Sequence, residues 1–268
     1  MLMNLLTQVE DLAFDVAKSI ILPNFGSIHA ENKSDGSLLT ETDIQAHNEL
    51  TEQLVKLADY PVLSEEMPSL EQQAIIDNEI SNYWCIDPID GTSNFVHGIP
   101  YWCISIALII EGQIKLAVVY DPNRKECFSA SDKIATTLNR KALISSESIQ
   151  TTELNCCLGM IDLKRLQPSV VQKLVLDPPY RSQRSFGASA LDLCWIAVRR
   201  CQLYLHGKQQ LWDYAAGLLI LKQAGAQAET FEGETVFQNN LIPKSVLAAS
   251  TDILMDKWKA YFQEIYKS

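Results

Sequence analysis

Two aspartates, Asp87 and Asp90, stand three positions apart in the segment WCIDPIDGTSNF, residues 84–95. Pro88 restricts the backbone between them, so the two carboxylates and the carbonyl oxygen of Ile89 can converge on one point. Carboxylates that converge in a partly dry site repel one another unless a cation binds them. Hard divalent ions, Mg²⁺ above all, prefer carboxylate, carbonyl and water ligands. The segment therefore predicts a metal site.

Gly91 and Thr92 follow the second aspartate directly. Their backbone N–H groups stand at the predicted start of a helix entered through Ser93 and Asn94, where N–H groups without intrahelical partners bind anions. Asp, Pro and Gly are also the commonest residues of surface turns. Here, however, apolar WCI and NFV flank the turn and indicate the edge of a core. A metal site and an anion site in one turn suit a phosphate group bridged by metal ions.

Further acidic residues stand beside predicted strand ends or helix starts. Glu65 and Glu66 follow a short apolar run, whereas Asp43 and Asp213 each stand where a helix is predicted to begin. N-capping residues belong at such helix starts. If the fold brings these side chains to the turn, they enlarge its carboxylate cluster.

Several segments resemble one known family. IDPIDGTSNF and LWDYAAG resemble the two signature motifs of the inositol monophosphatase family, which comprises Mg²⁺-dependent, Li⁺-inhibited phosphomonoesterases. KSDGSLLTETD (33–43) and LSEE (63–66) stand in the order and spacing of that family, so the resemblance covers nearly the whole chain. It implies a layered αβαβα fold, a cytoplasmic homodimer, and hydrolysis of a small phosphomonoester by a metal-activated water.

The resemblance also implies two or three Mg²⁺ ions per active site. Glu65, Asp87 and the carbonyl of Ile89 would bind the first ion. Asp87, Asp90 and Asp213 would bind the second, and Glu65 would contribute to a third, weaker one. Two such metals about 4 Å apart can stabilise both the attacking and the leaving oxygen of an in-line displacement.

By the same resemblance, Glu65 and Thr92 would orient and activate the attacking water, with Asp43 behind Thr92. These three residues are therefore the catalytic candidates. The backbone N–H groups of Gly91 and Thr92, beside Asp90, would hold the phosphate of the substrate.

The segment SFGASALDL (185–193) resembles the family segment whose backbone contacts substrate hydroxyl groups. Gly187 and Ser189 are therefore candidates for substrate binding.

One position departs from the family pattern. Enzymes specific for inositol monophosphate usually carry a glutamate seven residues before the aspartate of the second motif, where this chain has His206. A neutral imidazole offers one donor and one acceptor, whereas a carboxylate only accepts. His206, with Lys208 nearby, could equally suit a second phosphate. The substrate therefore stays open between inositol monophosphate or a related polyol or sugar phosphate, histidinol phosphate, and a 3′(2′),5′-bisphosphate nucleotide.

The chain is acidic, with 22 Lys plus Arg against 33 Asp plus Glu and a formal net charge of −11. Such a surface repels nucleic acids and anionic membranes, so direct nucleic-acid binding is not expected. A protein partner is not disfavoured by this charge. Some bacterial members of the family are regulatory partners of the transcription machinery, and that role is the alternative to catalysis.

No membrane span is expected. Apolar residues near the N-terminus recur at helical spacing among acidic ones, which predicts an amphipathic core-facing helix rather than a signal peptide. The longest apolar run elsewhere, CISIALII (103–110), is too short to cross a bilayer. The seven cysteines form no CxxC pair, so we expect buried free thiols in a reducing cytoplasm.

The order of elements predicts an α/β protein with two subdomains. Residues 1–140 are expected to form an α+β subdomain with most of the metal ligands, and residues 141–268 an α/β subdomain with Asp213 and the substrate-recognition segments. We expect residues 31–42 to form a loop or hairpin and residues 67–82 to be turn-like. Predicted helices cover 3–23, 43–58, 168–176, 189–200, 213–225 and 253–268, and predicted strands cover 60–66, 83–87, 102–110, 115–122, 127–131, 155–162, 201–207 and 245–250.

Overall fold

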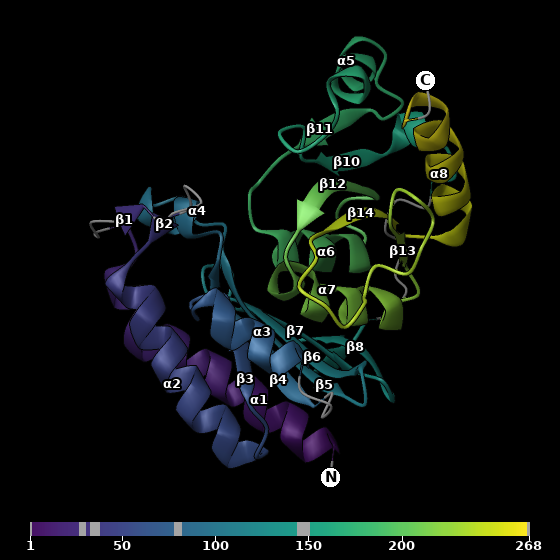
Figure 1. The fold of residues 1–268 in the computed structure, drawn as a ribbon. Helices are drawn as coiled ribbons and strands as arrows, with labels where there is room; N and C mark the ends of the chain where they lie inside the picture. The colour runs from purple at the N-terminus through teal and green to yellow at the C-terminus, as the bar shows by residue number, and fades with distance from the viewer. Residues whose placement is uncertain (1, 27–30, 33–37, 78–81, 144–150, 267–268) are drawn as a thin grey trace.

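The chain folds into five alternating layers of helices and sheets (Figure 1). The computed structural model describes residues 2–26, 31–32, 38–77, 82–143 and 151–266. Helices α1 (Leu2–Val16) and α2 (Glu41–Leu57) cover the outer face of a large sheet. Helices α6 (Ser189–Ala197) and α7 (Leu211–Gln223) pack between that sheet and a smaller one. Helices α5 (Pro168–Leu176) and α8 (Asp252–Tyr266) cover the outer face of the smaller sheet.

The large sheet has seven strands in chain order, and its neighbours are antiparallel except for the parallel pair β3 and β4. From β5 to β9, short turns join consecutive strands and make them antiparallel neighbours, whereas the segment with α3 joins the parallel pair β3 and β4. Its strands are β3 (Val62–Ser64), β4 (Tyr83–Asp90), β5 (Cys103–Ile110), β6 (Gln113–Asp121), β7 (Glu126–Ser131), β8 (Ile134–Leu138) and β9 (Lys141–Ala142).

The small sheet has the strand order β11-β10-β12-β14-β13. Strand β10 pairs in parallel with both neighbours, whereas β12–β14 and β13–β14 are antiparallel, so this sheet is mixed. Its strands are β10 (Leu158–Ile161), β11 (Ser182–Arg184), β12 (Leu203–Gln209), β13 (Gln227–Glu229) and β14 (Lys244–Ala249).

Three hydrophobic cores hold the layers together. One lies between α1, α2 and the large sheet, and another between the small sheet, α5 and α8. The largest surrounds α6 and α7 in the middle layer, where both helices carry apolar residues on nearly every side. A helix that is apolar all round is stable only when buried, which explains why these two helices form the central layer.

The structure differs from the sequence expectations at several elements. Segment 67–82, expected to be turn-like, contains helix α3 (Ser69–Asp77). Its buried Gln72 donates a hydrogen bond to the carbonyl of Ser64, a tertiary contact that no local pattern announces. The expected strand 155–162 begins only at Leu158, after the short 3₁₀ helix η3 (Leu154–Cys156). Helical residues after α1 continue as η1 (Ala17–Ile21) and η2 (Leu22–Asn24).

Other expectations agree with the structure. Strands β1 (Glu31–Asn32) and β2 (Leu38–Leu39) pair antiparallel, as in a hairpin. All seven cysteines lie in the described ranges and are free thiols, and five are buried as expected, whereas Cys127 and Cys156 are only half-buried. Among the described helices, none combines the length and the apolar character needed to span a bilayer. The predicted division at residue 140 falls between β8 and β9 of the large sheet, and the organisation into two subdomains stays a prediction.

Helices α6 and α7 approach closely because Gly217 has no side chain. A Cβ at this position would lie 2.8 Å from the Cβ of Leu193, which is closer than real contacts allow. We expect Gly217→Val to lower the free energy of unfolding by about 2–3 kcal/mol. Valine has a higher helix propensity than glycine, but the cost of overpacking against Leu193 exceeds that gain. Urea unfolding measures the change. The matched control is Lys222→Val on the exposed face of the same helix. Equal stabilities of the two variants would contradict the close-packing argument.

Candidate active site

An irregularity in β4 explains the spacing of the two aspartates in the first motif. Asp87 pairs with Ser105 of β5 and Asp90 pairs with Cys103, so three steps along β4 match two along β5. Residues three apart on a regular strand point to opposite faces of the sheet. The bulge adds one residue and turns the second carboxylate to the same face as the first. Both side chains therefore face the same cleft.

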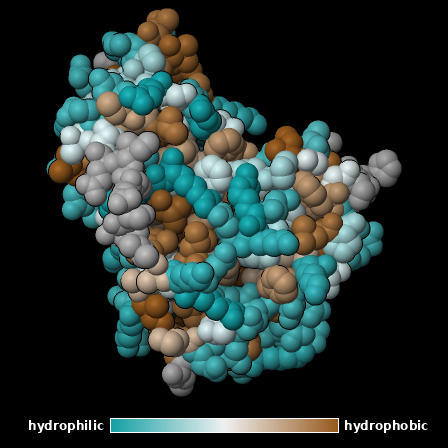
Figure 2. Space-filling model, turned by 180° about the vertical axis from the view of Figure 1, so that it is seen from behind, coloured by the Kyte–Doolittle hydropathy of each residue, from teal (hydrophilic) through white to brown (hydrophobic). Residues whose placement is uncertain are grey.

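The cleft lies between the two halves of the chain and has a volume of about 1170 Å³. Seen from behind, the surface is hollowed between a taller part and a lower part (Figure 2). Residues from both halves line it, including the end of β4, the first turn of α7 and strand β12.

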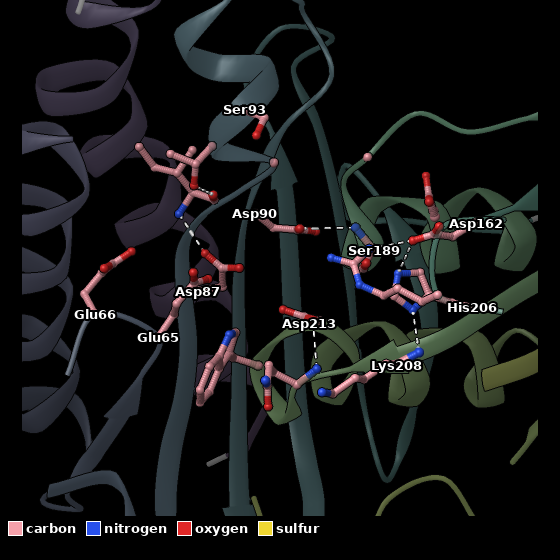
Figure 3. A pocket seen from close by; sticks show the side chains of 18 of the residues that line it. Glu65, Glu66, Asp87, Asp90, Ser93, Asp162, Ser189, His206, Lys208 and Asp213 are labelled. Carbon is pink, nitrogen blue, oxygen red and sulfur yellow. Dashed lines mark hydrogen bonds and ion pairs between the residues drawn. The ribbon is translucent and has the colours of Figure 1, made fainter. Parts of the chain in front are cut away.

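Three carboxylates meet inside this cleft (Figure 3). Glu65 follows β3, Asp87 lies in β4 and Asp213 lies in the first turn of α7. Each offers one oxygen, and these oxygens all lie within 4.8 Å of one another. The fold thus brings together three of the acidic residues that the sequence singled out, from three different elements.

The environment of Asp87, Asp90 and Asp213 opposes their ionisation. Burial raises the pKa of Asp87 well above its usual range, and the charge of Glu65 adds to the shift. Burial likewise raises the pKa of Asp213, with contributions from Asp90 and Glu65. Burial also raises the pKa of Asp90, to about 7, although the backbone N–H of Ala190 acts in the opposite direction. A bound divalent cation would relieve this repulsion, and the all-oxygen donor set suits a hard ion.

Asp90 connects the two halves of the chain. Its Oδ1 accepts a hydrogen bond from the backbone N–H of Ser189 at 3.1 Å, and its Oδ2 accepts from that of Ala190 at 2.7 Å. Both donors belong to the first turn of α6, whose N–H groups favour a negative charge. Asp90 lies outside the group of three within 4.8 Å. The N–H of Ser189 is therefore already used, and its side chain is hydrogen-bonded with Tyr204.

Two of the site's aspartates are oriented by capping boxes. Asp43 is the third residue of α2, and its Oδ2 accepts hydrogen bonds from the backbone N–H and the hydroxyl of Thr40. Asp213 is the third residue of α7, and its Oδ2 accepts from the backbone N–H of Gln210 at 2.8 Å. Helix α2 thus begins at Glu41, two residues before the expected start, with Thr40 as its N-cap. A reciprocal cap fixes each carboxylate relative to its helix axis.

The hydroxyl of Thr92 has two acceptors for its one proton. Its Oγ1 lies 3.0 Å from the carbonyl oxygen of Ile89 and 3.5 Å from Oδ1 of the fully buried Asp43. If a cation binds the Ile89 carbonyl, the Thr92 proton can turn to Asp43. Asp43 therefore lies behind Thr92, as the family resemblance implied.

Gly91 allows the chain to turn between β4 and α4 (Thr92–Val96). Its φ of 95° is in the left-handed region, and a Cβ there would lie 3.2 Å from the carbonyl oxygen of Gly187. Asn94 fixes this contact because its Nδ2 donates to the carbonyls of Tyr101 and Phe186. Gly91 and Gly187 therefore lie side by side at the cleft.

His206 lies in β12, lines the cleft and is 6% exposed. Its Nε2 lies 3.0 Å from Oδ2 of Asp162, which also accepts from Arg165 at 2.6 Å. We did not predict a site role for Asp162 or Arg165 from the sequence. Asp162 follows directly on β10, and its position after a strand end is the same signal that drew attention to Glu65.

Comparison with known proteins identifies the family. The model of the inositol monophosphatase family matches residues 2–267. A protein of Xylella fastidiosa named Nus factor SuhB is 31% identical over 212 residues, which cover 77% of this chain and 74% of that protein. A protein of Synechocystis named inositol-1-monophosphatase is 32% identical over 200 residues, 74% of this chain and 68% of that protein.

Among solved structures, the Thermotoga maritima IMPase superposes with a TM-score of 0.83 at 25% identity, covering 98% of both chains. This similarity confirms the layered α/β fold expected from the sequence. The chain belongs to the inositol monophosphatase family, and phosphomonoester hydrolysis is the reaction class of that family.

Proposed function

We propose that this protein hydrolyses a small phosphomonoester, inositol monophosphate or a related polyol or sugar phosphate, with two or three Mg²⁺ ions at the active site. The convergence of Glu65, Asp87 and Asp213 within 4.8 Å is the main support. Burial and the charge of Glu65 raise the pKa of both Asp87 and Asp213. Such a cluster of like charges is costly without a cation, and structural stability alone does not require it. The name of the Synechocystis relative supports the substrate class.

Each residue has a definite task in this proposal. Glu65, Asp87, Asp90, Asp213 and the Ile89 carbonyl would hold the Mg²⁺ ions. The ions would neutralise the phosphate charge and make water more acidic.

Binding of the phosphate and of the attacking water would depend on the turn after β4. The N–H groups of Gly91 and Thr92 would hold the phosphate. The Thr92 hydroxyl, donating to Asp43, keeps its lone pairs free to accept a hydrogen bond from the attacking water, and Glu65 would accept from the other side of that water.

We further propose a cytoplasmic location and a homodimer. The seven free thiols are consistent with a cytoplasmic protein. A homodimer follows from the family resemblance, and light scattering after gel filtration would show twice the monomer mass.

A second candidate function is regulatory binding to the transcription machinery, because the Xylella relative is named Nus factor SuhB. That role does not need the carboxylate cluster, which this chain keeps, so hydrolysis is the better supported function. A catalytically inactive variant that still binds purified RNA polymerase would favour the regulatory role.

Activity should depend on the carboxylate cluster. We expect Asp213→Asn to lower kcat/KM for inositol 1-phosphate at least about 100-fold in saturating Mg²⁺, because the lost charge weakens cation binding and transition-state stabilisation. Phosphate release measures the rate. Asp256→Asn, an exposed change of the same type on α8, is the control. Near-normal turnover of folded Asp213→Asn would exclude a metal-dependent role for this residue.

The cluster should also make stability depend on pH and metal. Asp87, Asp90 and Asp213 have raised pKa values in the folded protein, so their stabilising effect is present at low pH and lost as pH rises through those values. In EDTA, we expect the free energy of unfolding to fall by about 2 kcal/mol or more between pH 5.5 and pH 8.

Two comparisons test this prediction: stability with Mg²⁺ against stability in EDTA, and the wild-type protein against Asp213→Asn. Mg²⁺ should stabilise the protein more at pH 8 than at pH 5.5, because protons compete with the metal. Asp213→Asn should show a smaller fall in EDTA. A wild-type stability that is flat with pH and indifferent to Mg²⁺ would show that the cluster is not a cation site.

Lithium should inhibit the enzyme. Li⁺ is a small hard cation that can occupy a carboxylate site of Mg²⁺ but brings half the charge. We expect phosphate release to be slower in millimolar LiCl than in NaCl at equal ionic strength. Identical rates in the two salts would argue against a second metal site of the proposed kind.

A further inference from the structure

The cleft also holds cationic side chains. The carboxylate cluster is formed by β3, β4 and α7. Among the described residues that line the cleft, the lysine and arginine side chains are Arg165 and Lys208. Both lie on or beside β12, where His206 and Lys208 lie together in Figure 3. Burial raises the pKa of Asp213 and the charge of Arg165 acts in the opposite direction, so Arg165 lies within electrostatic reach of the cluster.

Arg165 is held against β12 by a close backbone contact. A Cβ at Gly207 would overlap the carbonyl oxygen of Arg165, so only glycine lets this loop lie directly on the strand. Gly207 stands between His206 and Lys208, and the contact therefore places Arg165 beside both. The loop is also fixed by Asp162, whose Oδ1 accepts the backbone N–H of Lys164 at 2.7 Å.

The carboxylate beside Arg165 is already used as an acceptor. Burial opposes the charge of Asp162, but hydrogen bonds from His206 and then from Arg165 lower the pKa of Asp162 below its usual range. This ionised carboxylate accepts from Lys164, Arg165 and His206 together.

The two ring nitrogens of His206 are occupied as well. Nε2 lies against Asp162, and Nδ1 accepts the backbone N–H of Lys208 at 3.3 Å. His206 therefore cannot replace a glutamate that accepts hydrogen bonds from sugar hydroxyls. Instead, it orients Asp162 and, through it, Arg165.

The groups that remain available are cationic donors. Of the five N–H groups of Arg165, those on one terminal nitrogen bind Asp162, and the side chain is 45% exposed. The Lys208 side chain is exposed and forms no ion pair within the described ranges. Guanidinium and ammonium groups that retain free donors bind phosphate or carboxylate far better than hydroxyl.

We propose that the substrate carries a second anionic group on its leaving-group side, a phosphate or a carboxylate, which Arg165 and Lys208 bind. This inference rests on the proposed phosphatase function and narrows its substrate class to polyol or sugar phosphates that carry a second anionic group, so inositol monophosphate would be a poorer substrate than these. The cleft volume of about 1170 Å³ leaves room for such a molecule, since small-molecule sites typically measure about 300–1000 Å³.

Three substrates that differ only at C6 test the proposal: glucose 1-phosphate, glucuronic acid 1-phosphate and glucose 1,6-bisphosphate. The second adds a carboxylate and the third a phosphate, so the three distinguish the two anions. We expect kcat/KM for at least one charged substrate to exceed that for glucose 1-phosphate about tenfold, the effect of a charge-assisted hydrogen bond. Release of the C1 phosphate is measured by detecting the remaining sugar product.

The variants are Arg165→Gln, Lys208→Gln and the double substitution. We expect the double variant to bring the preference for the charged substrate close to one, and high salt to reduce the wild-type preference. Lys173→Gln, an exposed charge removal on α5, should keep the preference. Arg165→Lys, which retains the charge, should keep more of it than Arg165→Gln.

The outcomes separate the two proposals. A wild-type protein that hydrolyses all three substrates equally well overturns the second-anion inference, and so does a preference that survives in the double variant. Lys208→Gln changes an exposed side chain, so its result does not depend on refolding. A wild-type protein that hydrolyses none of these substrates, nor inositol 1-phosphate, overturns the proposed function itself.

Discussion

Repulsion among Glu65, Asp87 and Asp213 is the constraint on which the site depends. Three carboxylate oxygens within 4.8 Å of one another would separate if their supports were flexible. Each is therefore held by a fixed element: Glu65 by the end of β3, Asp87 by the bulged strand β4 and Asp213 by the capping box of α7. The middle layer carries α7 against the large sheet, so hydrophobic burial holds together what electrostatics opposes.

Hydrogen bonds and close packing at the cleft fix the position of one half of the chain relative to the other. Asp90 from the large sheet accepts two N–H groups from the first turn of α6. Gly91 packs against Gly187, and Asn94 binds the carbonyl next to it. The proposed metal and phosphate sites therefore span the interface between the two halves, and any shift of one half against the other would distort them.

Local features of this site could be predicted from the sequence, whereas its long-range pairings could not. Acidic residues after apolar runs, and a proline and glycine around them, indicated the turn after β4. The bulge depends on the hydrogen-bond register with β5, which a single strand does not reveal. Asp162 and His206 are 44 positions apart and meet because β10 and β12 are parallel neighbours. Helix α3 was missed because its contacts, such as Gln72 to Ser64, are tertiary.

The central claim is that the three carboxylates form a divalent cation site. The most direct measurement is the anomalous scattering of crystals grown in Mn²⁺, a Mg²⁺ substitute with oxygen-ligand preference. The account predicts a strong peak within coordination distance, about 2.0–2.3 Å, of oxygens from Glu65, Asp87 and Asp213. A saturating Mn²⁺ concentration that gives no peak there, or gives peaks only elsewhere on the acidic surface, would contradict it.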